Sequence, residues 1–458
     1  MTFAFDLNGK AVSGDDGSVL LIDFLRYQLH LSGTKAACRE GDCGSCQVLV
    51  KSPAARMFKA MPSCLMRLQD CQNCQVITID GLPKNNPLIT TLASSGASQC
   101  GYCSPGLTIG LINWLLNGKA LSETEGASFI NANLCRCTGY MGQKRAIKAI
   151  GEEYSHLLLS AEDRVAFLQK VNVLPKIVVH AYHQNTTPAQ SPYYAQVQNK
   201  SAAILAGGGT DLYLHNKPSE NPVISLLKTG EDHVVRMSDD CVSISALHPI
   251  QLVADTIDTL ACLPAFSSFN HWFASLPIRN RATLGGNLAN ASPIADGICF
   301  FMALDTIIET NLRQVPIGQL FSGFKQTDLS LNEVITWLHV PKSVTRDYIY
   351  FEKVSRRGTT DIAVVNCCGR WQITDNNVSR VALVLGGASP VPVRLTSLEN
   401  NLLGHSLQES IEELVDTHLD AAISPIDDSR GSKVYRRLLA KQLLLSQWES
   451  VKEKANHA

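Results

Sequence analysis

The chain has 458 residues, enough for about three domains of ordinary size. Apolar residues make up 45% and charged residues 18%, and 40 Lys and Arg against 41 Asp and Glu leave a formal charge of −1. That balance argues against nucleic acid or an anionic membrane surface as the main partner. Because no apolar stretch approaches the ~18 residues that span a bilayer, and the start shows no signal-peptide pattern, we expect a cytoplasmic protein that does not enter membranes.

The cysteines are unevenly distributed. Ten of the 15 lie before residue 138, and five lie in the rest of the chain. Thiols stay reduced in the cytosol, so disulfides are a poor explanation for this number. Cysteines crowded into one third of such a chain predict metal binding or catalysis.

Residues 1–83 have the pattern of a small α+β domain. Apolar alternation over Phe3–Leu7 ends at Asn8-Gly9, which predicts an opening hairpin. A helix is expected over residues 20–29. Short strands are expected over residues 47–50 and 75–79.

A glycine-rich loop between these elements carries a first cysteine set. Its spacing, Cx4Cx2C followed by a distant cysteine, is typical of plant-type [2Fe–2S] ferredoxins. Gly41 and Gly44 suit a chain that wraps closely around sulfur, whereas zinc sites usually come as two CxxC knuckles. The cysteines of this set are Cys38, Cys43, Cys46 and, further along the chain, Cys64.

The residues alone leave the fourth ligand open. Cys71 and Cys74 also lie close in the sequence and resemble half a zinc knuckle. No second pair matches them, so we expect free thiols in a turn before the strand at 75–79.

From residue 87 to about 160 the pattern is helical. Leu107, Leu111 and Leu115 lie on one apolar face. Ser104-Pro105 fits the N-cap and N1 positions of this helix, and Gly118 fits the C′ position.

A second cysteine set precedes two expected helices. One half comes before the helix at Ser104, and the other before Thr138-Gly139, an expected cap for a helix over residues 140–158. Helix N-termini stabilise anions, as a thiolate-ligated cluster requires. These candidate ligands are Cys100, Cys103, Cys135 and Cys137.

The segments CREGDCGSC, QCGYCSPG and LCRCTGY resemble the iron–sulfur half of the molybdenum hydroxylases, the xanthine dehydrogenase and aldehyde oxidase family. The resemblance covers residues 1–155. It implies a plant-ferredoxin-like β-grasp domain (1–83) and a four-helix domain (84–160), each with one [2Fe–2S] cluster, and it favours Cys64 as the fourth ligand. Residues 141–144 depart from the family's usual Pro-Ile pair without changing a ligand.

A second motif follows a linker at 161–192. Three consecutive glycines come after an apolar strand and can present a nest of N–H groups to a pyrophosphate. The motif is not a Rossmann fingerprint, because Leu212 occupies its sixth position.

Together with residues 283–287 and 291–296, this motif resembles the FAD-binding fold of the same family and of vanillyl-alcohol-oxidase-type flavoproteins. The resemblance implies a two-part α+β FAD-binding domain (193–342) and a C-terminal α+β flavoprotein subdomain (343–458). It assigns to the diphosphate Leu205, Ala206, Gly207, Gly208, Gly209, Thr210, Asp211, Leu212, Thr283, Leu284, Gly285, Gly286 and Asn287. Asp296 is assigned to the ribose, and Phe273, Ile335 and Lys353 to the flavin, although Phe273 and Ile335 fit a core equally well.

The chain ends just after the flavin subdomain. The resemblance therefore implies the small subunit of a two-chain xanthine dehydrogenase, with no catalytic residue of its own and molybdopterin on a large partner subunit in an (αβ)2 heterotetramer. Hypoxanthine and xanthine would be oxidised to urate, with electrons passing through both clusters to FAD and then NAD⁺. The alternatives are a relative acting on aldehydes or other N-heterocycles, an oxygen-reducing relative, and a stand-alone iron–sulfur flavoprotein carrier.

Overall fold

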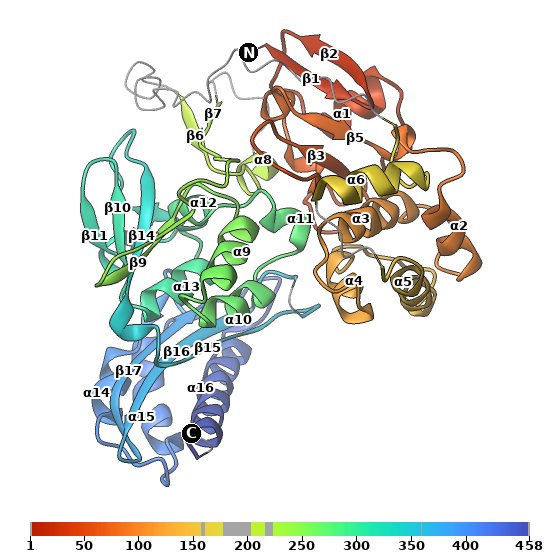
Figure 1. Cartoon of the computed structure of the whole chain (residues 1–458). Helices are drawn as coiled ribbons and strands as arrows, with labels where there is room; N and C mark the ends of the chain where they lie inside the picture. Colours follow the sequence, from red (N-terminus) through yellow and green to blue (C-terminus); the bar gives the residue numbers. More distant parts are fainter. Residues whose placement is uncertain (1, 157–160, 177–202, 216–222, 359, 457–458) are drawn as a thin grey trace. The chain divides into compact units, whose positions relative to one another are not determined.

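The computed structural model describes residues 2–156, 161–176, 203–215, 223–358 and 360–456 (Figure 1). Contacts divide the chain into two units. The first comprises Met1–Glu231 and Ser275–Arg281, and the second comprises Asp232–Ala274 and Ala282–Ala458.

The first unit opens with a mixed five-stranded sheet in the order β2-β1-β5-β3-β4, the β-grasp arrangement that the sequence predicts. The expected hairpin turn forms at Asn8 and Gly9, both with positive φ (54° and 81°). The expected helix forms as α1 (Leu21–Asp23) followed by a π-helical turn over Phe24–Gln28. The strands are β1 (Phe3–Leu7), β2 (Lys10–Gly14), β3 (Gln47–Lys51), β4 (Lys59–Pro62) and β5 (Gln75–Ile77).

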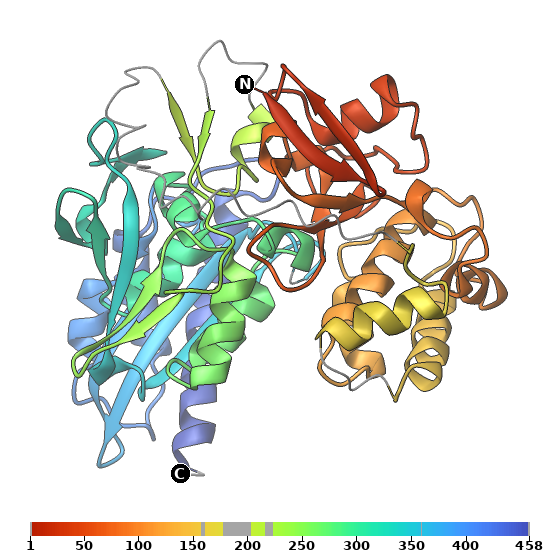
Figure 2. The same cartoon turned by 45° about the horizontal axis from the view of Figure 1, so that its top comes forward.

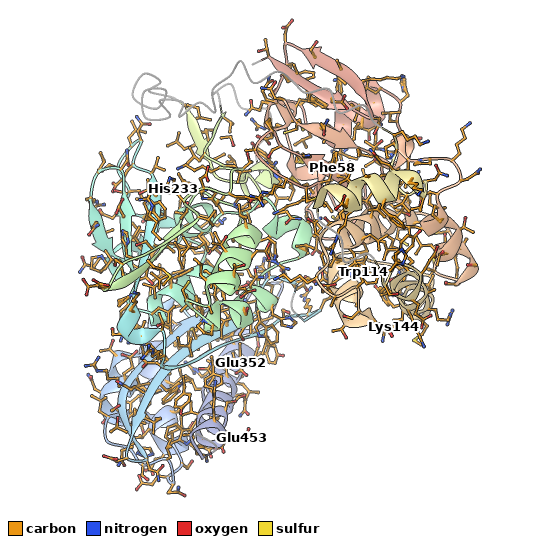
Figure 3. The ribbon with its side chains drawn as sticks, viewed as in Figure 1. Phe58, Trp114, Lys144, His233, Glu352 and Glu453 are labelled. Atoms are coloured by element: carbon orange, nitrogen blue, oxygen red, sulfur yellow. The ribbon has the colours of Figure 1, made fainter. Side chains whose placement is uncertain are left out.

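The helical part of this unit follows directly. Its helices are α2 (Pro87–Ser94), α3 (Ser104–Asn117), α4 (Glu123–Phe129), α5 (Met141–Glu153) and α6 (Ala161–Lys170). α3 forms the centre, with Trp114 fully buried (Figure 3). α6 packs on α3, and its Leu168 is buried in the same apolar core, although α6 lies in the segment expected to be a linker. Figure 2 shows the two helices side by side. The remainder of that segment, residues 177–192, lies outside the described residues.

Two helices differ from the prediction at both of their ends. α3 has Cys103 as its N-cap and Ser104 as its first residue, because the ligand loop runs straight into the helix. Gly118 ends α3 in an extended conformation (φ −64°, ψ 143°), and a Cβ there would lie 2.7 Å from the Trp114 carbonyl oxygen. Glycine is therefore needed at this position for close approach, not for positive φ. α5 ends at Glu153, and its N-cap is the left-handed Tyr140 (φ 68°), not Thr138-Gly139.

The first unit also contains the beginning of the expected flavin domain. β6 (Ile204–Ala206) pairs in parallel with β7 (Val223–Ser225), and α8 (Leu212–His215) lies between them in the chain. Ala206, Tyr213 and Val223 form a small apolar core against which Leu20 of the ferredoxin-like domain packs. α11 (Leu276–Arg279) belongs to the same unit.

The second unit begins with an antiparallel sheet in the order β11-β10-β14-β9-β8. The core of the second unit contains an aromatic cluster. The ring centroid of Phe269 lies 4.5 Å from that of Phe300, in a stacked arrangement, and 5.3 Å from that of Phe351, which it meets edge-on. The strands are β8 (Val235–Met237), β9 (Cys241–Ser245), β10 (Ile307–Thr310), β11 (Gln314–Pro316) and β14 (Ile335–Pro341), with a separate hairpin of β12 (Phe321–Gly323) and β13 (Gln326–Thr327). The helices are α9 (Ile250–Leu260), α10 (Ala265–Trp272), α12 (Leu284–Ala289) and α13 (Asp296–Ala303).

The C-terminal part of this unit is a four-stranded antiparallel sheet between two helical layers (Figure 1). α10 and α13 pack on one face, and the long α16 packs on the other, where Trp371 meets Trp448 at 5.5 Å. The elements are β15 (Tyr348–Val354), β16 (Val365–Thr374), β17 (Asn377–Gly386), β18 (Val393–Arg394), α14 (Thr396–Leu402), α15 (Glu412–Ala422) and α16 (Lys433–Asn456).

Among the helices of the described residues, none combines the length and the apolar character needed to cross a membrane.

Glu352 is a partly buried acid on β15 (Figure 3). Its Oε2 atom has no hydrogen-bond partner in the described residues. Burial raises the pKa of this carboxyl, and a hydrogen bond with Ser446 of α16 opposes the shift only in part. The folded chain therefore holds the proton more tightly than the unfolded chain does.

Glu352→Gln is expected to stabilise the second unit at neutral pH. The pKa of Glu352 is higher in the folded chain than in the unfolded chain, so the parent loses stability as the pH rises through the folded pKa. A glutamine at this position cannot ionise and therefore avoids this loss. The gain in thermal midpoint over the parent should be absent below about pH 4 and should grow toward about pH 7. Glu453→Gln on α16, where the side chain is exposed, is the matched control and should show no such trend (Figure 3). A gain that did not change with pH would contradict the assignment.

Candidate cofactor sites

The first cysteine set surrounds the loop before β3. The Sγ atoms of Cys46 and Cys64 lie 3.3 Å apart, and both residues are buried. Cys64 comes from the 3-10 turn Ser63–Leu65, so the tertiary fold brings it to the loop. Gly41 and Gly44 have positive φ (73° and 69°), as the sequence predicts.

The four cysteines are arranged as two pairs. A hydrogen bond from Cys38 lowers the pKa of the Cys43 thiol to about 5 and raises that of Cys38. A second hydrogen bond, between Cys46 and Cys64, lowers the pKa of the Cys46 thiol and raises that of the Cys64 thiol. Two thiolates per iron is the ligation of a [2Fe–2S] cluster, so the donor set fits this group.

The backbone of the loop also fits a cluster. The amide of Glu40 donates to Cys38 Sγ at 3.4 Å. A Cβ on Gly41 would lie 2.5 Å from the Ile278 side chain, and one on Gly44 would lie 2.6 Å from Asn133. Only glycine lets the chain run this closely between its neighbours while turning N–H groups toward sulfur.

Cys71 and Cys74 lie elsewhere. Both are buried in the apolar core of the β-grasp sheet, in a different cluster of side chains from Cys46 and Cys64. Burial raises the pKa of Cys74 to about 12 and that of Cys71 well above its usual range, so both are neutral thiols. The geometry favours Cys64 as the fourth ligand, and the assignment stays a prediction.

The second cysteine set also forms two pairs. Each pair joins one cysteine of the loop at 100–103 to one of the loop at 135–137. Cys100 interacts with Cys137, and Cys103 with Cys135. Burial and the contact with Cys135 raise the pKa of Cys103 to about 12. Cys103 and Cys135 are buried, whereas Cys100 and Cys137 are exposed. In the part of the chain that the structure describes, no three or more His, Cys, Asp or Glu side chains are arranged to hold one metal ion.

Sequence reasoning missed the residue that joins the two cysteine loops. The Asn133 side chain donates to the Gly44 carbonyl at 3.1 Å and accepts from Gln47 at 3.1 Å. The Leu134 amide donates to the Cys43 carbonyl at 3.1 Å. Asn133 stands two residues before Cys135, but Asn131 in the same segment is also polar, so the sequence alone did not single out Asn133.

The first flavin segment follows β6. Of its glycines in the described structure, Gly209 is the one with positive φ (72°), and a Cβ there would lie 2.5 Å from the Tyr213 ring. The Gly208 carbonyl accepts two hydrogen bonds from Arg281, at 2.8 and 3.1 Å. The remaining residues predicted for the diphosphate here are Leu205 and Ala206 in β6, Gly207, Thr210 and Asp211 in the turn, and Leu212 at the start of α8.

The second flavin segment lies in the other unit. Thr283 caps α12 by accepting from the Gly286 amide at 3.0 Å. A Cβ on Gly285 would lie 2.8 Å from the Ala246 carbonyl, so this glycine permits a close helix–strand approach. Leu284 is buried, and Asn287 has a buried Oδ1 atom without a hydrogen-bond partner in the described residues.

Two predicted flavin residues bind each other. Lys353 Nζ lies 2.9 Å from Asp296 Oδ2, and Asn366, which the sequence did not indicate, donates to Asp296 Oδ1 at 2.7 Å. Phe273 is buried 5.5 Å from Phe269, and Ile335 is buried at the start of β14, so both are core residues of this unit. Their contact with flavin stays a prediction.

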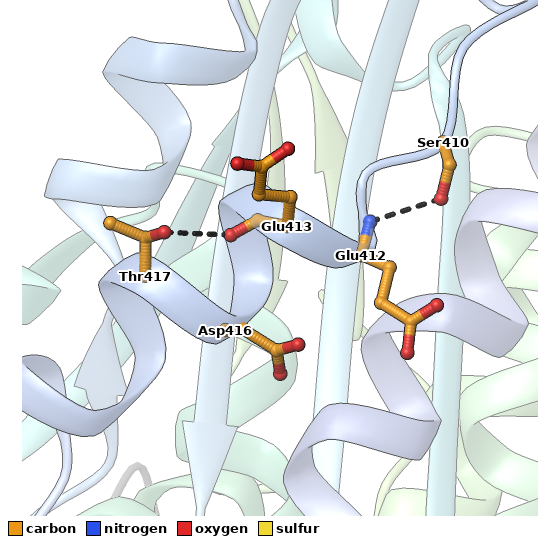
Figure 4. A pocket seen from close by; sticks show the side chains of 5 residues that line it. All are labelled: Ser410, Glu412, Glu413, Asp416 and Thr417. Carbon is orange, nitrogen blue, oxygen red and sulfur yellow. Dashed lines mark hydrogen bonds between the residues drawn. The ribbon is translucent and has the colours of Figure 1, made fainter.

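An acidic hollow on α15 has a structural explanation. It is lined by Ser410, Glu412, Glu413, Asp416 and Thr417 (Figure 4). The Ser410 hydroxyl accepts from the Glu412 amide, and Lys441 bridges Glu412 and Asp416 at 2.9 and 2.7 Å. These contacts secure α15 against α16.

Four known domain families match the chain in order. They are a 2Fe-2S iron-sulfur cluster binding domain (5–69), a [2Fe-2S] binding domain (78–148), the FAD binding domain in molybdopterin dehydrogenase (182–343) and the CO dehydrogenase flavoprotein C-terminal domain (349–451). In this order the four domains are similar to the iron–sulfur and FAD-binding part of the molybdenum hydroxylases. This chain is thus an electron-transfer module with iron–sulfur and FAD-binding domains. The first match includes Cys64 and ends before Cys71.

Similar proteins support the same family. Xanthine dehydrogenase 2 of Arabidopsis thaliana is 28% identical over 84% of this chain and 35% of its own length, and the Drosophila subobscura xanthine dehydrogenase is 25% identical over 99% and 39%. The chain therefore spans well under half the length of these xanthine dehydrogenases. A solved chain of carbon monoxide dehydrogenase from Hydrogenophaga pseudoflava matches at 26% identity with a TM-score of 0.51, over 56% of this chain and 91% of that one. Quinoline 2-oxidoreductase from Pseudomonas putida 86 shares the fold, with a TM-score of 0.52 at 19% identity over 58% of this chain and 95% of that one.

Cys64→Ser is expected to remove one of two EPR signals of the reduced protein and to lower its iron from about four to about two atoms per chain. The signal of the helical domain should remain, because its ligands lie in other loops. Cys71→Ser and Cys74→Ser are the controls, and both signals should survive them. Loss of a cluster in Cys71→Ser but not in Cys64→Ser would reverse the assignment.

Gly209→Ala is expected to weaken FAD binding by about tenfold, since an L-residue is strained at this φ and its Cβ meets the Tyr213 ring. Fluorescence titration of the FAD-free protein measures the effect. Gly404→Ala, at a similar φ (77°) with open space around it, carries the backbone strain alone and should leave FAD affinity unchanged. Iron content should be the same in both variants. Equal affinities would show that the loop does not contact FAD.

Proposed function

We propose that this chain is the electron-transfer part of a xanthine dehydrogenase. When bound, two [2Fe–2S] clusters and FAD would carry electrons from a molybdenum centre on a partner subunit to NAD⁺. The chain's own residues bind these groups, set their spacing and control their exposure. The observation that carries the proposal is the presence of both iron–sulfur domains and the FAD-binding domains in one chain, which is similar to xanthine dehydrogenases over most of its length.

The first cysteine set lies beside residues of α8 and α11. Leu214 of α8 and Ile278 of α11 pack against the apolar cluster that contains the buried Cys46 and Cys64. These two cysteines therefore lie close to α8, which follows the first flavin segment. Such burial suits a site that hands electrons to flavin within the same chain.

The two cysteine sets are held at a constant separation. Leu134 and Asn133, which directly precede the second CRC loop, donate to the carbonyls of Cys43 and Gly44. The Tyr102 hydroxyl donates to the Ala36 carbonyl at 2.6 Å and adds a third bond between the loops. A constant spacing of this kind is what the protein contributes to electron transfer between centres.

The second cysteine set is open to a partner. Cys100 and Cys137 are exposed, and large apolar side chains beside the ligand cysteines are exposed with them. These are Tyr102, Leu134, Tyr140 and Met141. Exposed apolar residues gathered around a redox site mark an interaction surface. We assign it to the molybdopterin-binding subunit, in an (αβ)2 heterotetramer.

The proposed substrates are hypoxanthine and xanthine, after the named relatives. The solved relatives keep a second candidate open, because they are named for carbon monoxide and quinoline. In that case the same module would serve a molybdenum hydroxylase acting on an N-heterocycle or an aldehyde. Substrate choice then belongs to the partner, so this chain would be unchanged in its role.

Reconstitution with the partner tests the proposal. The purified chain with its cofactors should reduce an artificial acceptor with NADH and should not hydroxylate xanthine or aldehydes. Xanthine-dependent NAD⁺ reduction should appear only after the large subunit is added, and it should be followed by absorbance of NADH and urate. Cys100→Ser is the matched variant: it should abolish xanthine-dependent turnover and spare the NADH–acceptor activity.

Three results would change the assignment. No NADH activity despite bound FAD would favour an oxygen-reducing relative. Turnover of an aldehyde or N-heterocycle but not xanthine would favour the second candidate. Xanthine oxidation by the chain alone would refute the two-subunit proposal.

A further inference from the structure

We infer that Asp70, Tyr213 and Arg281 form a buried latch through which the ferredoxin-like domain holds the glycine turn at residues 207–209 in the conformation that binds FAD. The inference rests on the proposed role of this turn as the site of the FAD diphosphate. It adds positioning residues from outside the motif, one of which belongs to the iron–sulfur domain.

Arg281 is the centre of the latch. Its Nη2 atom lies 3.0 Å from Asp70 Oδ2 and 2.8 Å from the Gly208 carbonyl oxygen, and its Nε atom lies 3.1 Å from that same oxygen. One guanidinium thus joins a carboxylate of the ferredoxin-like domain to the backbone of the glycine turn. The planar fork of arginine allows both contacts at once, which the point charge of lysine cannot.

The charges in the latch are withdrawn from water. The side chains of Arg281 and Asp70 are 2% and 4% exposed. A buried ion pair adds little to stability, because desolvation offsets the attraction, but it fixes geometry strictly. Asp70 is itself held by the Arg67 amide, which donates to Oδ2 at 2.9 Å. The pair therefore acts as a positioning device.

Tyr213 connects the latch to the next glycine. Its hydroxyl donates to Asp70 Oδ1 at 3.3 Å, and its amide donates to the Gly209 carbonyl at 3.0 Å. Its ring lies where a Cβ of Gly209 would be, and the Arg67 guanidinium covers the ring at 4.7 Å. The same network thus constrains both Gly208 and Gly209.

The constraint has a direct electrostatic consequence. A phosphate is bound by backbone N–H groups and repelled by carbonyl oxygens. With its oxygen held by two N–H groups of Arg281, Gly208 cannot turn that oxygen toward an anion. Loss of the latch would leave the Gly208 carbonyl free to rotate. Binding of FAD would then have to order the turn, and the conformational entropy lost would weaken FAD affinity.

Arg281→Lys and Asp70→Asn test the latch. Each is expected to weaken FAD binding about tenfold, because one strong hydrogen bond to the turn or to its holder is lost. Affinity for FMN, which lacks the diphosphate, should change less than twofold in a competition titration. Arg313→Lys and Asp328→Asn, which alter an ion pair of the second unit, are matched controls for the two chemical changes. Iron content should equal that of the parent throughout.

The double variant separates positioning from general destabilisation. Because both residues act on one carbonyl, Asp70→Asn with Arg281→Lys should bind FAD no more weakly than the worse single variant. Additive losses, or equal losses for FAD and FMN, would overturn the latch.

Two further outcomes are distinguishable. If the parent chain does not bind FAD, the proposed function fails, not the latch. If Arg281→Lys does not fold, Tyr213→Phe decides, since it removes one hydroxyl and keeps the ring. FAD affinity should then fall about threefold, and an unchanged value would refute the inference.

Discussion

The carbonyl oxygens of Cys43 and Gly44 accept hydrogen bonds from Leu134 and Asn133, and these bonds hold the two cysteine loops of the first unit side by side. A loop that wraps around sulfur leaves its carbonyls pointing outward, and buried carbonyls need donors. The segment before the second CRC motif supplies those donors. Satisfying one loop's backbone therefore places the other loop beside it, and the requirement for Gly44 follows from the contact with Asn133.

Each unit also contains one buried ion pair beside its part of the expected flavin site. Arg281 pairs with Asp70 in the first unit, and Lys353 pairs with Asp296 in the second. In both, a further hydrogen bond completes the carboxylate: Tyr213 on Asp70 and Asn366 on Asp296. Charges buried in this way set the direction of neighbouring groups more than they stabilise the fold. The flavin segments are thus shaped by residues outside the glycine motifs.

Elements whose conformation depends only on residues close together in the sequence were predicted correctly. The Asn8-Gly9 turn needs only two residues with positive φ, and the helix that contains Leu107, Leu111 and Leu115 follows from their apolar spacing. Helix ends were read less well. Gly118 looked like a left-handed C′ residue, but it is there because Trp114 approaches its backbone. α6 lay in an expected linker, because its helical pattern is weak and burial of Leu168 against α3 stabilises it.

The sequence alone determined the chemistry of the cysteine sets. Thiolate number and loop spacing are local properties, and they restrict the metal group before any fold is known. Only the tertiary structure decided which sulfur atoms pair, that Cys71 and Cys74 belong to a core, and that Arg281 holds the Gly208 carbonyl. Those relations join residues far apart in the chain. They arise from packing and from the need to satisfy buried polar groups, neither of which leaves a local pattern.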